Sequence, residues 1–194
     1  MMMQNVVMTT PWDEDESLDD LRSAYRRGQK VITAPLLSVL DIAELVLERL
    51  PGQVDGWKLE KLCYLVQAKH LARTGLPAFK EPVEAWTHGP VVDHLYQAHK
   101  GQYNIRSVGG DARDAESEDT ISQVIDEVVE GYGAWTGRQL RELTHSQAPW
   151  LEARQGLNPS ERSRRQIEPG AMREYFEVLE QLPNDDYEDD NSPF

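Results

Sequence analysis

The residues best suited to chemistry are five histidines, and their spacing predicts neither a catalytic site nor a metal site. Zinc-binding histidines on one helix usually stand four residues apart, whereas His94 and His99 are five apart and project about 140° away from each other. The chain also lacks the glycine-rich loops of nucleotide enzymes and the G-x-S-x-G elbow of hydrolases. We therefore expect no catalytic residue, no metal and no cofactor. The histidines are His70, His88, His94, His99 and His145.

The single cysteine and a run of arginines each admit a reactive and a structural interpretation. Cys63 lies inside an apolar helical pattern, which favours a small core residue over a nucleophile near His70. Arg162, Arg164 and Arg165 could contact phosphates, but arginines in a polar loop more often form solvated or intramolecular ion pairs. One cysteine permits no intrachain disulfide, which is typical of a reducing compartment, so a cytoplasmic location is expected.

Charge and length limit the classes of function. The 194 residues include 34 Asp and Glu against 20 Lys and Arg, giving a net charge of −14 that argues against general nucleic-acid binding. No stretch approaches the roughly 20 apolar residues of a membrane span. Acidic residues crowd both ends, which predicts a partly disordered acidic extension over residues 1–35 and an acidic disordered tail over residues 183–194. Residues 36–182 are expected to form one domain.

The elements that would position any site are mainly helices. An apolar stripe predicts a first helix over residues 36–50, and a helix over residues 57–73 is apolar on most sides, so it should be central and closed by Gly75. Later helices are expected over residues 120–132, from Thr136, over residues 149–154 and from Pro169. The stripe of the first helix comprises Leu36, Leu40, Ala43, Leu47 and Leu50.

Two capping boxes mark helix starts, one formed by Thr120 with Gln123 and the other by Thr136 with Gln139. Trp135 and Leu140 occupy the two positions of a hydrophobic staple around the second box, so we expect Trp135 to belong to the core. The other expected core residues are Leu59, Leu62, Cys63, Val66 and Trp150.

The middle of the chain is irregular. Two short extended pieces, over residues 82–87 and 103–108, could pair as a small antiparallel ribbon. Between them, His88-Gly89-Pro90 is expected to turn the chain into a helix with Pro90 near its first turn. The predicted fold is therefore a compact, mainly α single domain with a small β-ribbon near residues 82–108.

Two motifs in this order carry a resemblance to a known family. The first is a helical run, Lys58-Leu59-Glu60-Lys61-Leu62-Cys63-Tyr64, and the second is Glu84-Ala85-Trp86-Thr87-His88-Gly89-Pro90-Val91. Together they resemble the Panacea domain family of SocA-like antitoxins and phage-associated GepA-like proteins. The resemblance runs from about residue 36 to residue 182, and either motif alone would be weak.

The resemblance implies an antitoxin that neutralises a cognate protein toxin, encoded by an adjacent gene, through direct contact. It also leaves open an adaptor that delivers the toxin to a protease. A DNA-binding regulator is a further alternative, which the acidic helix over residues 120–132 weakens. Aromatic residues on loops often anchor interfaces, so the turn of the second motif is the expected toxin-facing corner, although its aromatic residues could serve the core instead. The corner comprises Trp86, His88, Gly89, Pro90, Asp93 and His94.

Overall fold

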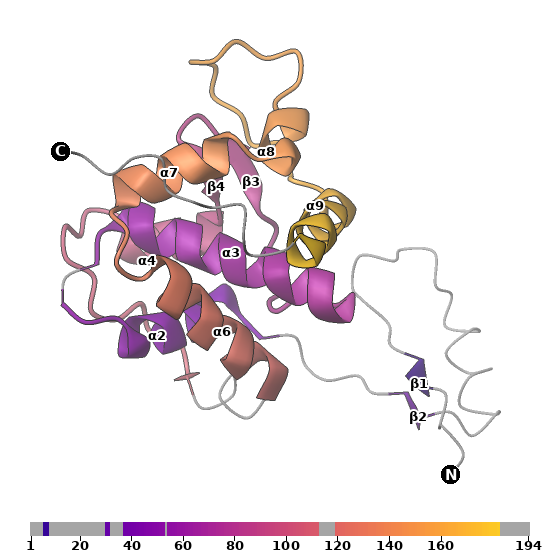
Figure 1. Cartoon of the computed structure of the whole chain (residues 1–194). Coiled ribbons are helices and arrows are strands. Elements are labelled where there is room, and N and C mark those ends of the chain that lie inside the picture. Colours follow the sequence, from indigo (N-terminus) through magenta and orange to yellow (C-terminus); the bar gives the residue numbers. More distant parts are fainter. Residues whose placement is uncertain (1–5, 8–29, 32–36, 53, 113–118, 183–194) are drawn as a thin grey trace, which may run out of the picture.

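The computed structural model describes residues 6–7, 30–31, 37–52, 54–112 and 119–182 (Figure 1). The predicted acidic tail over residues 183–194 lies outside the described residues, as does most of the predicted extension over residues 1–35. Within that extension, β1 (Val6–Val7) pairs in parallel with β2 (Lys30–Val31). The remaining described residues form a mainly α fold with one small antiparallel ribbon, which confirms the predicted fold class.

Helix α3 (Gly56–Thr74) is the central element, as the sequence predicted. It crosses the middle of the molecule and contacts five other helices (Figure 1), which are α2 (Val39–Arg49), α4 (Asp93–His99), α6 (Asp119–Tyr132), α7 (Gly137–His145) and α9 (Pro169–Gln181). The side chain of Asp55 caps its start by accepting from the backbone N–H of Lys58 at 2.9 Å, and Gly75 closes it with a φ of 74°. Because the other helices cover most of its sides, α3 is buried along nearly its whole length.

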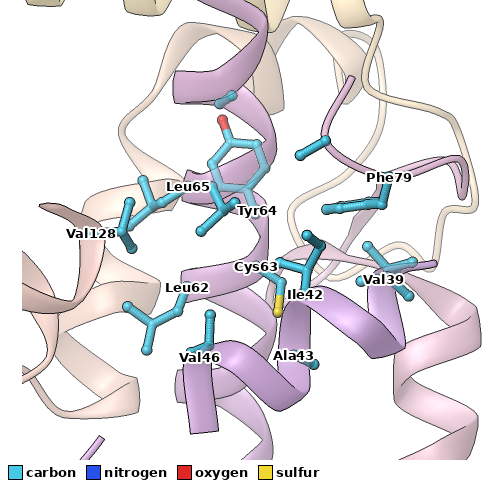
Figure 2. Packing of buried hydrophobic residues seen from close by; sticks show 14 of the residues in the cluster. Val39, Ile42, Ala43, Val46, Leu62, Cys63, Tyr64, Leu65, Phe79 and Val128 are labelled. Carbon is cyan, nitrogen blue, oxygen red and sulfur yellow. The ribbon is translucent and has the colours of Figure 1, made fainter. Parts of the chain in front are cut away.

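The core gathers around α3, and Figure 2 shows its packing against α2 and α6. Leu59, Leu62, Cys63 and Val66 are fully buried, and Trp150 is buried except for 8% of its surface. Burial also raises the pKa of the Cys63 thiol well above its ordinary value, so the thiol stays protonated at neutral pH. Cys63 is thus a small apolar core residue.

Helix α2 (Val39–Arg49) turns to the core a face that overlaps the predicted one only in part. Ser38 and Asp41 form a capping box that starts the helix at Val39, and the residues that face α3 are Val39, Ile42 and Val46 with their neighbours. The predicted stripe was right for Ala43 and Leu50, which are buried, and wrong for Leu40 and Leu47, which are only partly buried at its flank. Both stripes are apolar, and only the neighbouring helices decide between them.

Helix α6 (Asp119–Tyr132) forms where a helix was predicted and buries one apolar face, with Ile121, Val124, Ile125 and Val128 buried. It begins one residue before the predicted cap, so Thr120 is inside the helix and is not its N-cap. Its outer face is acidic and pairs with other helices. Arg49 of α2 pairs with Asp126, and Arg73 of α3 makes a two-bond pair with Glu127 at 2.8 and 2.9 Å.

In the described part of the chain, α6 is followed by α7 (Gly137–His145), α8 (Ala148–Ala153) and α9 (Pro169–Gln181). The capping box of Thr136 and Gln139 is present at the start of α7, as predicted. The expectation that Trp135 is a core residue was wrong, because 36% of Trp135 is exposed and its ring lies against Tyr132 at the surface. Leu140, the other staple position, is fully buried.

The ribbon is a hairpin of β3 (Glu84–Trp86) and β4 (Gly89–Val91), followed by α4 (Asp93–His99). The prediction paired residues 82–87 with residues 103–108, which was wrong. Strand β3 pairs with β4, and Ile105 forms a bridge with Val54. Pro90 lies in β4 rather than at a helix start, which the hairpin tolerates because β4 is an edge strand. Among the described helices, none is long and apolar enough to cross a membrane.

Candidate functional site

A groove of about 830 Å³ opens where the first turns of α3 meet the hairpin, α4 and the loop over residues 160–164. We call it the basic groove. Its floor is formed by buried charged side chains, its walls by aromatic rings, and its rim by cations and a histidine. The floor comprises Glu60, Lys61 and His99, the walls Trp57, Trp86 and Tyr96, and the rim His88, Lys100, Arg162 and Arg164.

Glu60 and His99 form a buried pair in the floor. His99 Nε2 lies 2.9 Å from Glu60 Oε1, while Glu60 Oε2 accepts from the backbone N–H of Val92 at 2.9 Å. Burial raises the pKa of Glu60, and its bonds to His99 and Val92 oppose that rise. Gly56 lets the imidazole approach, because a Cβ there would lie 2.7 Å from His99 Cε1. The pair therefore fastens α4 to the first turns of α3.

Lys61 joins the two motifs of the sequence. Its Nζ donates to the carbonyl oxygen of Pro90 at 2.7 Å, and only 1% of the residue is exposed. Burial lowers the pKa of Lys61 to about 8, although the charge of Glu60 beside it opposes the shift. Lys61 thus holds the hairpin turn against the central helix with a charge-assisted hydrogen bond.

Gly89 permits this contact for two reasons. Its φ of 103° lies in the region that disfavours side chains, and an added Cβ would lie 2.7 Å from Lys61 Cε. Gly52 has a similar φ of 87° with no atom within 4 Å of an added Cβ, so it serves as a control for backbone strain alone.

We expect Gly89→Ala to lower the free energy of unfolding more than Gly52→Ala does. Both changes add strain at a positive φ, on the order of 1–3 kcal/mol, and only Gly89→Ala also displaces Lys61. Urea denaturation of the two variants and the wild type measures the difference. Equal losses in both variants would show that Lys61 moves aside without cost.

The outer side of the hairpin rests on two stacked rings. His145 and Trp150 lie parallel, with ring centroids 4.1 Å apart, and Trp150 Nε1 donates to the carbonyl oxygen of Trp86 at 3.0 Å. Burial, together with the charges of Arg141, Lys61 and His88, lowers the pKa of His145 to about 4, and a hydrogen bond with the His88 backbone opposes this shift. His145 is therefore neutral at pH 7.

This lowered pKa predicts an acid-dependent loss of stability. The folded protein binds the His145 proton more weakly than the unfolded chain does, so the contribution is fully present above pH 6.5 and is lost as the pH falls towards 4. His145→Phe keeps a ring on Trp150 but does not titrate. Melting curves should show a larger fall in Tm between pH 7 and pH 4.5 for the wild type than for the variant. Equal falls would contradict the assignment.

The loop that carries the rim arginines is fastened beside β3. The backbone N–H of Ala85 donates to the carbonyl oxygen of Arg165 at 2.8 Å, and that of Ile167 donates to Val83 at 2.8 Å. The buried guanidinium of Arg154 donates to Ala85 at 2.9 Å and to Glu161 at 2.8 Å. These bonds hold the loop at the groove without using the side chains of its own arginines.

The residues of the expected toxin-facing corner have different environments in the structure. Trp86 is half-buried and His88 exposed, and both line the basic groove. Gly89 and Pro90 are buried, so they shape the turn and offer a partner no accessible side chain, which corrects their place in the expected surface.

The two helical residues of that corner lie off the groove. Asp93 lies 3.4 Å from Arg164 and accepts from Gln97 at 3.0 Å. His94 lies 3.0 Å from Glu81, a carboxylate that also accepts from the backbone N–H of Val39 at 2.8 Å. Asp93 and His94 therefore have intramolecular roles in holding α4 to its neighbours.

Sequence reasoning missed the floor of the groove and undervalued one arginine. Arg164 and Arg165 follow the structural interpretation, since Arg164 pairs with Asp93 and Arg165 donates to the carbonyl oxygen of Gln155. Arg162, however, lines the groove and has no hydrogen bond or ion pair to any other described residue. The available signal for the floor was a Glu-Lys pair, Glu60-Lys61, inside the most apolar helix, where charges must find partners.

The polar groups of the groove divide between its floor and its rim. In the floor, Glu60, His99 and Lys61 each bond to another protein group. Among the described residues, no three His, Cys, Asp or Glu side chains gather closely enough to hold a metal ion. Exposed cations and aromatic rings remain for contact with another molecule.

Comparison with known families confirms the resemblance seen in the sequence. Residues 59–151 match the family model described as "Antitoxin SocA-like, Panacea domain". The matched segment holds the groove floor, the hairpin and α4, whereas Trp57 and the loop with Arg162 and Arg164 lie outside it. No curated protein and no solved structure gives a significant match to the chain.

Proposed function

We propose that this chain is an antitoxin that neutralises a cognate protein toxin by direct binding. The observation that carries the proposal is the match of residues 59–151 to the SocA-like Panacea antitoxin domain. The two motifs of that segment meet at one place, where Lys61 holds the carbonyl oxygen of Pro90 and shapes one groove. A non-catalytic role in the cytoplasm, within a toxin–antitoxin pair that serves phage defence, belongs to the same proposal.

The toxin-facing surface is proposed to include Trp86 and His88, together with the exposed rings and cations of the groove around them. Interfaces commonly draw their binding energy from aromatic and arginine side chains near the centre of the contact. Trp57 is 45% exposed and stands beside His88, with ring centroids 5.7 Å apart. Together these side chains offer the mixed apolar and charged surface that such contacts need.

Two alternative functions also depend on binding a macromolecule, either a second protein or DNA. An adaptor that delivers the toxin to a protease would use the same toxin contact and a second one for the protease. A DNA-binding regulator would require a helix with a basic outer face, and the outer face of α6 presents Asp126, Glu127 and Glu130. We therefore place toxin binding first and the regulator last.

The proposal predicts that the chain rescues growth from the product of an adjacent gene. Cells that express the neighbour from an inducible plasmid should stop growing, and co-expression of this chain should restore growth. A stable complex should survive purification and bury an interface of roughly 1,600 Å². A neighbour that is harmless alone, or equally lethal with and without this chain, would contradict the antitoxin function. Rescue that requires a host protease would instead support the adaptor.

A further inference from the structure

We infer that the basic groove receives an acidic segment of the partner toxin, with carboxylates held by the rim cations and apolar side chains held by the wall rings. This inference rests on the proposed function, because it assigns chemistry to the surface that a toxin would contact. It predicts that the partner carries a run of Asp and Glu beside an apolar residue. The family match does not give this property of the partner.

The charge of the groove is opposite to that of the chain. Lys61, Lys100, Arg162 and Arg164 line it, and the one carboxylate in the lining, Glu60, already bonds to His99 and Val92. The whole chain carries a net charge of −14. A local cationic concavity on an acidic protein favours an anionic ligand at that place alone, because exposed charges farther away than about 10 Å are largely screened by salt.

The rim cations have donors to spare. Within the described residues, Arg162 makes no hydrogen bond or ion pair, and Lys100 makes only a cation–π contact, 5.8 Å from the Tyr96 ring centroid. Arg164 is 67% exposed, and its bonds to Asp93 are long, at 3.4 and 3.5 Å. An arginine has five donors in a planar fork that matches a carboxylate, so these side chains can accept partners without breaking the fold.

The wall rings favour a carboxylate peptide over a nucleotide. The guanidinium of Arg164 lies over Trp86 at 5.8 Å, and that of Arg141 lies over Trp57 at 5.5 Å. A stacked guanidinium keeps its N–H edge free for a carboxylate, while it covers a ring face on which a base would stack. The chain also lacks a glycine-rich phosphate loop. Trp57 still exposes 45% of its surface, enough for an apolar side chain beside the acidic ones.

Two matched double variants test the inference. Arg162→Glu with Arg164→Glu reverses the rim, while Arg106→Glu with Arg173→Glu makes the same change in net charge at exposed positions outside the groove. The single variant Arg162→Glu changes a side chain that makes no hydrogen bond or ion pair to another described residue, so it keeps the test valid if the double rim variant is less stable. A melting curve accompanies each variant.

The first measurement uses a labelled probe peptide, acetyl-Glu-Asp-Glu-Trp-Asp-Glu-amide, against the full chain by fluorescence anisotropy. We expect saturable binding that weakens with added salt, weakens at least about tenfold in both rim variants, and is unchanged in the Arg106/Arg173 variant. The neutral peptide acetyl-Gln-Asn-Gln-Trp-Asn-Gln-amide should not bind. Equal binding by wild type and rim variants, or tighter binding of ATP than of the acidic peptide, would overturn the inference.

The second measurement repeats growth rescue and co-purification with the same variants. Loss of the complex in the rim variants, with the Arg106/Arg173 variant intact, supports the inference. Full rescue by well-folded rim variants would remove the groove from the contact and leave the antitoxin function standing. If the wild-type chain rescues nothing, the proposed function fails, and the probe peptide alone still decides whether the groove binds acidic segments.

Discussion

Glu60→Ala is expected to lower the free energy of unfolding by about 3–5 kcal/mol, because it removes the shared hydrogen-bond partner of two buried groups. Only 2% of Glu60 is exposed, and its two oxygens hold His99 and the backbone N–H of Val92. The substitution leaves both of those groups buried without an acceptor. For a domain of ordinary stability, such a loss is a large share of the total.

Urea denaturation followed by circular dichroism measures the loss, and two variants control it. Glu60→Gln keeps a carbonyl oxygen of similar shape, so it should cost less than Glu60→Ala. Glu48→Ala removes an exposed carboxylate from α2 and should change stability by no more than about 0.5 kcal/mol. A Glu60→Ala variant as stable as the Glu48→Ala control would show that water enters the floor and replaces the carboxylate.

Leu62→Ala is expected to cost about 2–5 kcal/mol through lost burial and the cavity left behind. Leu62 is fully buried on α3, and it lies with Val46 and Leu65 in the packed region between α2, α3 and α6 (Figure 2). Because three helices build this region, its side chains cannot all close on the vacated space without a shift of those helices.

Leu151→Ala is the matched control, because it removes the same atoms from a position on α8 that is 50% exposed. We expect a much smaller loss for it in the same urea titration. In cells, Leu62→Ala should abolish growth rescue by lowering the amount of folded protein, whereas Leu151→Ala should keep it. Similar losses of stability for the two leucines would mean that the core around Leu62 repacks freely.

Local patterns predicted those helices whose signal is complete within one turn or one face. The central position of α3 followed from apolar residues on most of its sides, and Gly75 closes it in the left-handed conformation as expected. The start of α7 followed from the capping box of Thr136 and Gln139, whose bonds join residues three apart. Such contacts depend on neighbours in sequence, so a sequence contains them in full.

Patterns failed where two local solutions were equally good. Helix α2 has two apolar stripes, and the packing of α3 and α6 selects the one with Val39, Ile42 and Val46. Trp135 stands in a staple position, but α7 buries Leu140 and leaves the indole against Tyr132 at the surface. Strand β3 pairs with β4, the next strand along the chain, across the two-residue turn at Thr87 and His88. In each case the choice was made by segments distant in sequence or by turn geometry.

The sequence by itself determined that the chain folds as a mainly α domain around one apolar helix and that it carries the two motifs of the SocA-like Panacea domain. Only the tertiary structure decided that these motifs build one site. Glu60 and His99 are 39 residues apart, and Lys61 and Pro90 are 29 apart, yet each pair bonds directly in the groove floor. Charges in a core are stable only when partners from other segments satisfy them, and periodicity carries no information about those partners.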